Sequence, residues 1–194
     1  MNIVEALTQS SGDVEIYTPP NILKAIRQTF DRPIDLDPAS CLVANETVQA
    51  RRFFSKEDNG LSQSWAADTL WLNHPFNRGW VACDEHCQRK TCAKRGFHTP
   101  FNIPSNTDWI TKLLSEQDNY GAACCICFAS TSEEWFQPLM DFPQCYLSPR
   151  TNYRKPDGTP YKGVLKGSVV TLVKGDLTRF KEAFRGFGKI KILA

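Results

Sequence analysis

The sequence predicts an α/β fold: an abbreviated sheet that is parallel in its early part, with helices on both faces and a late antiparallel hairpin. Three observations predict this fold. Short apolar runs bounded by turn residues alternate with segments whose apolar residues repeat at helical spacing. Polar residues close several of these runs, as expected at the carboxyl ends of parallel strands, where ligands collect in open sheets. A long connection, residues 148–167, separates two late apolar runs and suggests a hairpin with an extended arm.

The first half of the chain predicts two helices, three short strands and a helical turn. Ile22, Ile26 and Phe30 repeat at helical spacing, and the prolines of Tyr17-Thr-Pro-Pro20 precede them, where a helix tolerates proline. The expected elements are helices at 21–30 and 41–52, strands at 33–37, 53–54 and 70–72, and a helical turn at 61–65.

The second half predicts a central buried strand with helices around it. Adjacent residues of a strand point to opposite faces, so Cys124 and Cys125 in the apolar run 122–129 are expected to be core residues on the two sides of the sheet. Trp109 and Leu113 are spaced by four, as on one face of a helix. The expected elements are helices at 109–117, 135–139 and 177–184, strands at 122–129, 145–147 and 168–173, and an edge strand at 189–193.

Length and composition indicate one ordinary globular domain, residues 1–194, with 41% hydrophobic and 23% charged residues. The net charge is only +2, so any contact with nucleic acid must come from local basic patches. No run approaches the roughly 18 apolar residues of a membrane span, and the N-terminus lacks the cationic start and long apolar core of an export signal. We therefore expect a cytoplasmic protein whose eight cysteines are reduced.

The tetrapeptide Asn73-His74-Pro75-Phe76, directly after the apolar run 70–72, is the main candidate for a catalytic site. Asn73 offers a side-chain carbonyl and His74 a backbone carbonyl, which are two acceptors for an exocyclic amine. Pro75 biases His74 toward an extended backbone, and Phe76 provides a flat face on which a base could stack. A strand that leaves through a proline turn would give the same pattern, so the tetrapeptide does not decide the function by itself.

A cysteine-rich basic insertion is expected at about 83–108, a segment that looks irregular and polar. Three thiols and an imidazole occur there at short spacing, and tetrahedral zinc accepts such a ligand set. The candidate metal ligands are Cys83, Cys87, Cys92 and His98, with His86 as a further candidate. The spacing departs from the tight Cys-x2-Cys knuckle, so free thiols in a loop remain the alternative.

Two clusters of basic residues are candidates for contacts with phosphates. Solvated surface charge is the competing interpretation of both clusters. The residues are Arg89, Lys90, Lys94 and Arg95 in the insertion, and Arg150, Arg154 and Lys155 in the late connection.

Three motifs occur in a fixed order: Tyr17-Thr-Pro-Pro20, Leu36-Asp-Pro-Ala-Ser40 and Asn73-His-Pro-Phe76. This order resembles the amino-methyltransferases that use S-adenosylmethionine, with His74 where a proline usually stands. The sequence is most similar to the small bacteriophage and prophage DNA N6-adenine methyltransferases, which are Dam-like. Their chains carry similar strings around Phe53-Phe-Ser-Lys-Glu-Asp-Asn-Gly-Leu61 and in the cysteine-rich segment. The resemblance spans most of residues 15–175.

The resemblance implies a Rossmann-like methyltransferase sheet that binds S-adenosylmethionine and DNA in the cytoplasm of a bacterial host. It implies that Asn73, His74, Pro75 and Phe76 bind and activate the target amine. The cofactor-binding residues that it implies are Thr18 and Pro19 at the methionine end, Asp37, Pro38 and Ala39 below it, and Asp58 or Asn59 at the ribose or adenine.

Three departures from the family pattern bear on activity. The segment 40–45 has no glycine where methyltransferases commonly have a glycine-rich loop. The interval from Asp37 to Asn73 leaves room for one compact crossover, since a βαβ unit takes roughly 30 residues. His74 replaces a proline, and we expect a surface histidine there, with a role as proton acceptor as the alternative.

These observations together predict an S-adenosylmethionine-dependent, site-specific DNA adenine-N6 methyltransferase of phage or prophage type, with Zn²⁺ as an additional candidate ligand. The same chemistry on RNA adenine, on cytosine N4 or on a protein amide is a second interpretation. A catalytically silent nucleic-acid-binding protein that uses the cysteine-rich basic module is the third.

Overall fold

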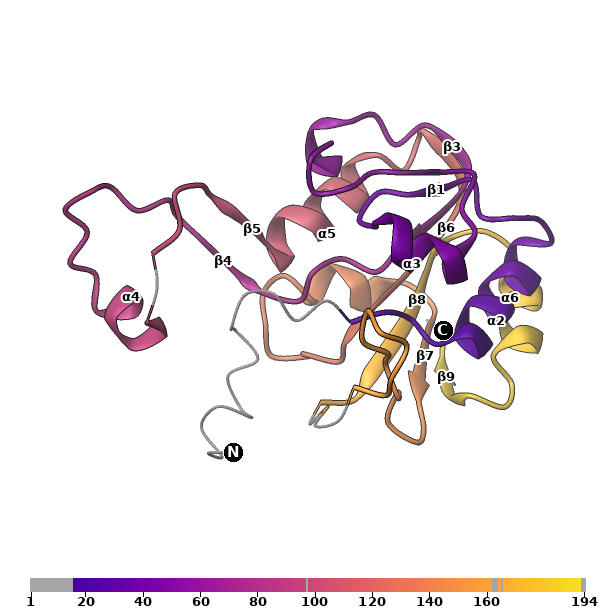
Figure 1. Ribbon diagram of the computed structural model, residues 1–194. Helices are drawn as coiled ribbons and strands as arrows, with labels where there is room; N and C mark the ends of the chain where they lie inside the picture. The colour runs from indigo at the N-terminus through magenta and orange to yellow at the C-terminus, as the bar shows by residue number, and fades with distance from the viewer. Residues whose placement is uncertain (1–15, 97, 162–163, 165, 193–194) are drawn as a thin grey trace.

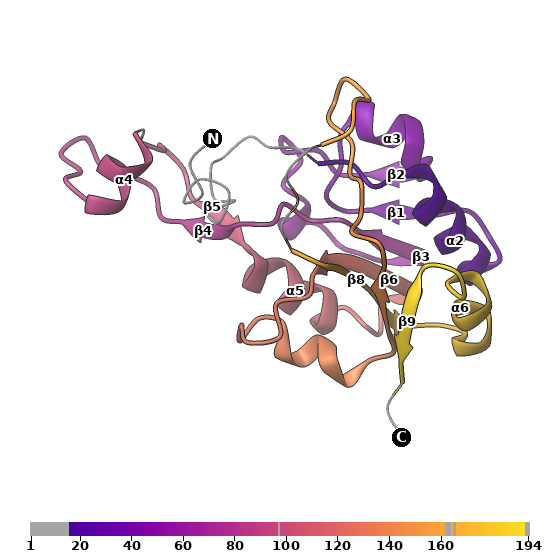
Figure 2. The same cartoon turned by 90° about the horizontal axis from the view of Figure 1, so that it is seen from below.

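A seven-stranded sheet organises the part of the chain that the computed structural model describes, residues 16–96, 98–161, 164 and 166–192 (Figures 1 and 2). The strand order is β2-β1-β3-β6-β8-β7-β9. The strands are β1 (Leu36–Asp37), β2 (Arg52–Phe53), β3 (Ala67–Leu72), β6 (Tyr120–Phe128), β7 (Gln144–Leu147), β8 (Ser168–Lys174) and β9 (Gly188–Lys191). The predicted α/β architecture is confirmed.

Helices cover both faces of this sheet, as predicted. Ile26 of α2 and Phe180 of α6 belong to the apolar core of one face, whereas Leu113 of α5 belongs to the core of the other (Figure 2). The helices are α2 (Pro20–Phe30), α3 (Leu42–Val48), α5 (Asn106–Ser115) and α6 (Leu177–Ala183), with 3-10 turns η1 (Gly60–Ser62) and η2 (Gln137–Asp141). None of the helices in the described ranges combines the length and the apolar content needed to cross a membrane.

The central strand β6 connects the two cores. Its residues alternate between the faces, so that Cys124 belongs to the core under α2 and α6 and Cys125 to the core under α5. Both thiols are fully buried, and burial raises the pKa of Cys125 to about 12. The prediction that these cysteines are core residues is confirmed.

The early strands β2, β1, β3 and β6 are parallel, and this places their carboxyl ends at one edge. Leu36 lies opposite both Arg52 and Leu70, and Leu72 lies opposite Cys125. The helix α3, the two-residue strand β2 and the turn η1 occur between β1 and β3, so this short interval contains a single α-helix.

The late strands reverse direction. β8 is antiparallel to both β6 and β7, and β9 is antiparallel to β7. The predicted hairpin of the strands around 145–147 and 168–173 is confirmed, and so is the edge strand at the C-terminal end. The connection between β7 and β8 runs back to the start of the described chain, where Tyr17 pairs with Arg154.

A two-stranded arm extends away from the sheet (Figures 1 and 2). It consists of β4 (Arg78–Trp80) and β5 (Ile103–Ser105), which pair antiparallel, and of α4 (Lys90–Arg95) between them. The expectation of an irregular segment at 83–108 is therefore wrong for α4 and β5. The helix α5, expected at 109–117, begins at Asn106 because Ser105 and Asp108 form a reciprocal capping box.

Candidate active site

The carboxyl edge of the parallel strands brings together the motifs that the sequence singled out. Asp37 ends β1, and Asn73 directly follows β3, its neighbour in the sheet. Phe128 ends β6, the next strand along. Ligands of open α/β sheets bind at such an edge, so this is the place to look for a site.

Asn73 presents an unused acceptor at this edge. Its Nδ2 donates to the backbone carbonyl of Ile16 at 3.1 Å, and this bond fixes the orientation of the amide, because a carbonyl can only accept. The other end of the amide, Oδ1, is buried and has no hydrogen-bond partner among the residues that the structure describes. An orphaned buried acceptor costs about 1–3 kcal/mol, so the fold tolerates a polar atom that a ligand could satisfy.

His74 is buried, with 2% of its surface exposed, and the expectation of a surface histidine is wrong. Its Nε2 lies 3.0 Å from Asn106 Oδ1 and donates to it, since the amide oxygen can only accept. Burial lowers the pKa of the imidazole to about 4, which the Asn106 bond opposes. The ring is therefore neutral near pH 7, and its buried Nδ1 is an acceptor that bonds to none of the described residues.

Aromatic rings hold Phe76 in place. Its ring centroid lies 4.6 Å from that of Phe128 and 6.2 Å from that of Tyr153, and the His74 ring contacts it edge-on at 5.2 Å. Phe76 is half-buried, and the preceding Pro75 is exposed. The flat side chain is thus fixed at the edge of the site without being sealed inside the core.

The segment 16–19 crosses the carboxyl edge as a strap. Its Ile16 carbonyl holds Asn73, and its Tyr17 hydroxyl lies 3.2 Å from Cys41 Sγ at the N-cap of α3. Thr18 and Pro19 are buried, and within the described part of the chain Thr18 Oγ1 has no hydrogen-bond partner. The strap therefore connects the Asn73 end of the edge with the region after Asp37.

Asp37 is a buried carboxyl group, with 2% of its surface exposed. Its Oδ1 accepts from the backbone N–H of Ala39 at 3.2 Å, while Pro38 between them is buried. Burial raises the pKa of Asp37 to about 7, against the effect of the Ala39 bond. A group with this pKa can carry or lose a proton near neutrality, which is typical of functional sites.

Asp58 and Asn59 lie in an exposed loop beside this motif. Asp58 Oδ2 accepts from the backbone N–H and the hydroxyl of Ser55, and these bonds lower its pKa. The loop reaches the Asp37 segment at Gly60, where a Cβ would stand 2.0 Å from the carbonyl oxygen of Pro38. Asp58 is thus next to the candidate cofactor motif, although its carboxylate already caps its own turn.

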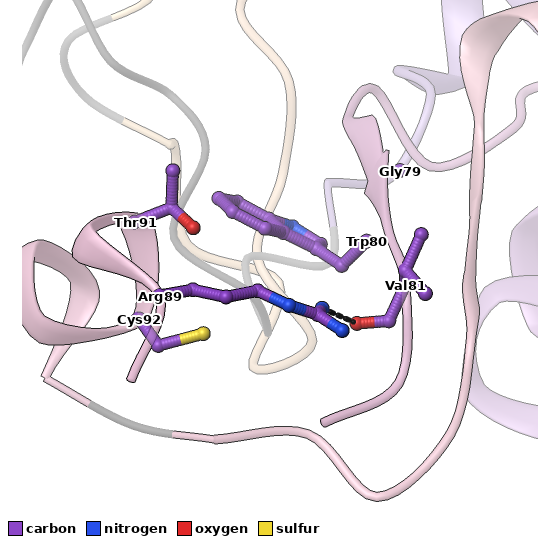
Figure 3. A pocket seen from close by; sticks show the side chains of 6 residues that line it. All are labelled: Gly79, Trp80, Val81, Arg89, Thr91 and Cys92. Carbon is purple, nitrogen blue, oxygen red and sulfur yellow. Dashed lines mark hydrogen bonds between the residues drawn. The ribbon is translucent and has the colours of Figure 1, made fainter. Parts of the chain in front are cut away.

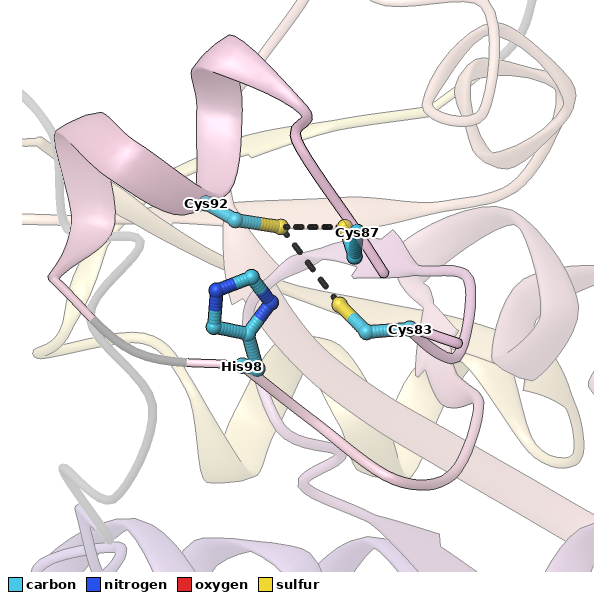
Figure 4. Close-up of side chains that lie close together, drawn as sticks. All are labelled: Cys83, Cys87, Cys92 and His98. Atoms are coloured by element: carbon cyan, nitrogen blue, oxygen red, sulfur yellow. Dashed lines mark hydrogen bonds between the residues drawn. The ribbon is translucent and has the colours of Figure 1, made fainter. Parts of the chain in front are cut away.

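The cysteine-rich residues converge at the far end of the arm (Figure 4). The ligand atoms of Cys83, Cys87, Cys92 and His98 all lie within 4.8 Å of one another. A hydrogen bond with the Thr99 backbone is the main cause that lowers the pKa of the Cys83 thiol to about 6, and a hydrogen bond with the His98 side chain also lowers this pKa. His86, the further candidate, is exposed beside Glu85.

A hollow of about 370 Å³ lies next to this cluster (Figure 3). Its lining includes Trp80, Arg89 and Cys92, so one of the clustered thiols borders it. The Arg89 guanidinium donates to the carbonyls of Val81 and Ala82, at 2.9 and 3.0 Å. Part of the hydrogen-bonding capacity of Arg89 therefore holds the arm together.

The basic residues fall into two places, as their sequence positions suggest. Lys90 and Lys94 are exposed on α4, and Arg95 ends this helix. Arg150, Arg154 and Lys155 are exposed in the β7–β8 connection. Arg154 pairs through its backbone with Tyr17, so the second group lies beside the strap.

Some residues of the site escaped the sequence interpretation. Asn106 holds His74 from 32 positions away, Ile16 orients Asn73, and Tyr153 is a buried ring that bonds Ser168. Thr151, two residues before Tyr153, has a buried hydroxyl that bonds to none of the described residues. These contacts join distant segments, so no local pattern marks them.

The chain matches the family model described as DNA N-6-adenine-methyltransferase (Dam) over residues 6–147 of its 194 residues. The match includes the strap, both candidate motifs and the cysteine-rich arm, and it ends with β7. No curated protein matches the chain. Because the match covers well over half of the sequence, the chain belongs to the DNA N-6-adenine-methyltransferase (Dam) family.

Proposed function

We propose that this protein transfers the methyl group of S-adenosylmethionine to the N6 amino group of adenine in DNA. The observation that carries the proposal is the buried Oδ1 of Asn73 at the carboxyl edge of the sheet, which no described residue satisfies. Family membership supports the reaction type. The roles of individual residues below are inferred from their chemistry.

The amine end of the site consists of two oxygen acceptors. Asn73 Oδ1 and the backbone carbonyl of His74 accept hydrogen bonds from the two N–H groups of the adenine amine, which draws the nitrogen lone pair out of the ring system. The nitrogen attacks the methyl carbon as the carbon–sulfur bond breaks, and the proton that the methylated nitrogen then loses passes to water. The neutral His74 imidazole adds no positive charge beside the reacting nitrogen. A neutral ring with a pKa near 4 is a weak base, so His74 serves in positioning through its carbonyl and its bond to Asn106.

Phe76 provides the stacking surface for the target base. An adenine in duplex DNA must leave the stack at a cost of a few kcal/mol before it can enter such a site. The Phe128 and Tyr153 rings restrain Phe76, so stacking requires little further ordering of its side chain. Pro75, exposed at the same turn, limits the backbone of His74 to conformations that aim its carbonyl.

The cofactor end lies between the strap and β1. S-adenosylmethionine supplies an activated methyl group on a sulfonium, and it carries an ammonium group as well. The unpaired Thr18 hydroxyl and the Asp37 carboxyl fit such a ligand, because one offers a hydrogen bond and the other a negative charge once it loses its proton. Pro19, Pro38 and Ala39 would form the walls, and Asp58 or Asn59 would reach the ribose or adenine from the adjoining loop.

The basic residues supply contacts with DNA phosphates on two sides of the site. Arg89, Lys90, Lys94 and Arg95 would act from the arm, and Arg150, Arg154 and Lys155 from the connection beside the strap. Contacts of this kind position the duplex and make binding dependent on salt. We further infer, from the resemblance of the sequence, a phage or prophage origin and a place of action in the cytoplasm of a bacterial host.

The decisive experiment is incubation of the full-length protein with methyl-labelled S-adenosylmethionine and unmethylated DNA, followed by mass spectrometry of the nucleosides. We expect N6-methyladenine, and we expect Asn73→Ala to reduce its formation by at least about 100-fold, since removal of one transition-state hydrogen-bonding group commonly costs that much. Asn119→Ala, at the opposite end of β6, is the matched control and should leave the yield unchanged.

Other outcomes would identify a different acceptor or no reaction. Bound cofactor without labelled DNA would redirect the search to RNA adenine, cytosine N4 or a protein amide. No cofactor binding at all would favour a catalytically silent nucleic-acid-binding protein. The glycine-free segment 40–45 and the histidine at position 74 are the two features that favour this last alternative.

A further inference from the structure

The arm contains four potential metal ligands that face one another. Cys92 Sγ lies 3.5 Å from Cys83 Sγ and 3.7 Å from Cys87 Sγ, and the His98 ring points into the same group (Figure 4). All four ligand atoms are within 4.8 Å of one another. None of the three thiols is joined in a disulfide, since the sulfur separations are well beyond a disulfide bond of about 2.05 Å.

These separations match the edges of a zinc tetrahedron. A Zn–S distance of about 2.3 Å implies sulfur atoms about 3.8 Å apart, because a tetrahedral edge is about 1.6 times the distance from centre to corner. The two sulfur–sulfur separations from Cys92, 3.5 and 3.7 Å, are within a few tenths of an ångström of this value. One ion at the centre could therefore contact all four side chains with little movement of the backbone.

The arm lacks an apolar core that would otherwise explain its fold. Among the described residues from 81 to 102, only Cys92 and Thr99 are buried, and Val81 and Phe101 are largely exposed. The strands β4 and β5 have three residues each, and α4 has six. An isolated hairpin or a helix of this length is marginal in water, and small units without a core commonly depend on a metal or on disulfides.

The four side chains come from separate pieces of the arm. Cys83 follows β4, Cys87 lies in a turn closed by its N–H to the Asp84 carbonyl, Cys92 is in α4, and His98 follows this helix. The Cys83 N–H also donates to the Thr99 carbonyl at 2.8 Å, which joins the two ends of the cluster. A central ion would therefore cross-link the whole distal half of the arm.

We propose that Cys83, Cys87, Cys92 and His98 bind one zinc ion in a closed, structural site that folds the arm. Thiolate-rich sets with one imidazole suit zinc better than magnesium, calcium or manganese, which prefer oxygen. Four protein ligands complete the tetrahedron, so no position is left for water or substrate, and the ion serves structure. The proposal does not rest on methyl transfer, because the cluster lies on the arm and away from the Asn73 edge.

The test is metal analysis of the full-length protein purified without chelators. We expect one zinc per chain, and cobalt substitution should give the intense visible absorption of a tetrahedral thiolate site. Removal of zinc with a strong chelator should deprotect the amide hydrogens of Cys83 and Gly96, whose bonds to Thr99 and Cys92 lie in the arm, while β6 amides stay protected.

Matched variants assign the ligands. His98→Ala should weaken zinc binding by more than about 100-fold in competition with a chelator, since loss of an outer-shell partner alone costs about 10–100-fold. His86→Ala, an exposed histidine of the same arm, should leave zinc affinity unchanged. Cys87→Ser should resemble His98→Ala.

Two results would overturn the proposal. One is the absence of zinc from the wild-type protein together with a failure to bind added zinc or cobalt under reducing conditions. The other is undiminished affinity in both His98→Ala and Cys87→Ser. Misfolding of a variant cannot produce either result. The first result uses the wild-type chain, and in the second the variants still bind zinc with full affinity, which a misfolded arm would not do.

Discussion

Asp37 is expected to make the stability of the protein fall as pH rises, and Asp37→Asn should remove this effect. The carboxyl group is buried, and burial raises its pKa from 3.8 to about 7. In the unfolded chain the group loses its proton near its ordinary pKa, whereas the folded protein keeps it until the pH approaches 7. The unfolded state therefore binds fewer protons over this window, and the free energy of unfolding decreases with pH.

The size of the effect follows from the two pKa values. Each pKa unit corresponds to about 1.4 kcal/mol, and integration from about pH 5 to about pH 8 gives a loss of about 2.5 kcal/mol. Asparagine has the shape of the protonated acid and can still accept from the Ala39 N–H. The stability of Asp37→Asn relative to wild type should thus rise by about 2.5 kcal/mol over the same interval.

Urea unfolding at several pH values measures this difference directly. Asp58→Asn is the control, because the bonds from Ser55 lower the pKa of Asp58. The ionised Asp58 carboxylate stabilises the fold at every pH above its ordinary pKa, and this stabilisation is lost only as the pH falls below that value. The stability difference between Asp58→Asn and wild type should therefore be constant from about pH 5 to about pH 8. A constant difference between Asp37→Asn and wild type over this interval would show that the folded protein does not hold a proton on Asp37.

Three further predictions concern the same site and the arm. The contribution of His74 to stability should fall as the pH drops from about 6.5 to about 4, because the folded imidazole stays neutral while the unfolded one takes up a proton. In urea unfolding, the stability of His74→Gln relative to wild type should therefore rise as the pH drops over this interval, and a constant difference would contradict the burial argument. Binding of S-adenosylmethionine should release a proton from Asp37 below about pH 7, because a cationic ligand favours the ionised carboxylate. Calorimetry in buffers of different ionisation enthalpy should detect this proton as a buffer-dependent heat of binding that Asp37→Asn lacks. Equal heats in all buffers for wild type would count against an ion pair between Asp37 and the cofactor. Lys94→Ala should reduce the salt slope of DNA binding by about 1, whereas Lys181→Ala on α6 should leave it unchanged; equal slopes for both variants would exclude a phosphate contact at Lys94.

The main elements of the fold were predictable because their signals are local. The helix α2 has apolar residues at helical spacing and prolines at its start, and β6 is a long apolar run between polar turns. The parallel order of the first strands followed from the alternation of strand and helix patterns. Each of these features depends on residues that are close together in the sequence.

The features that were missed depend on contacts between distant residues. His74 precedes a proline at a strand end, where a histidine normally meets solvent, but Asn106 and α5 cover it. The arm strands β4 and β5 have only three residues each and are separated by 22 residues of irregular or short helical structure, so no periodicity marks them. The strap became visible only when its Ile16 carbonyl was seen to hold Asn73.

The two buried titratable groups of the site oppose each other in the energetics of folding. Between about pH 4 and about pH 6.5 the folded protein keeps a proton on Asp37 and keeps one off His74, so folding takes up one proton at the first group and releases one at the second. Their pH slopes have equal size and opposite sign, and the wild-type contribution of the pair is therefore nearly constant in this window. Both groups are uncharged in the folded state, so the carboxyl edge is a neutral polar surface with several unpaired atoms. Such a surface avoids the cost of burying an isolated charge until a cationic ligand draws the proton from Asp37.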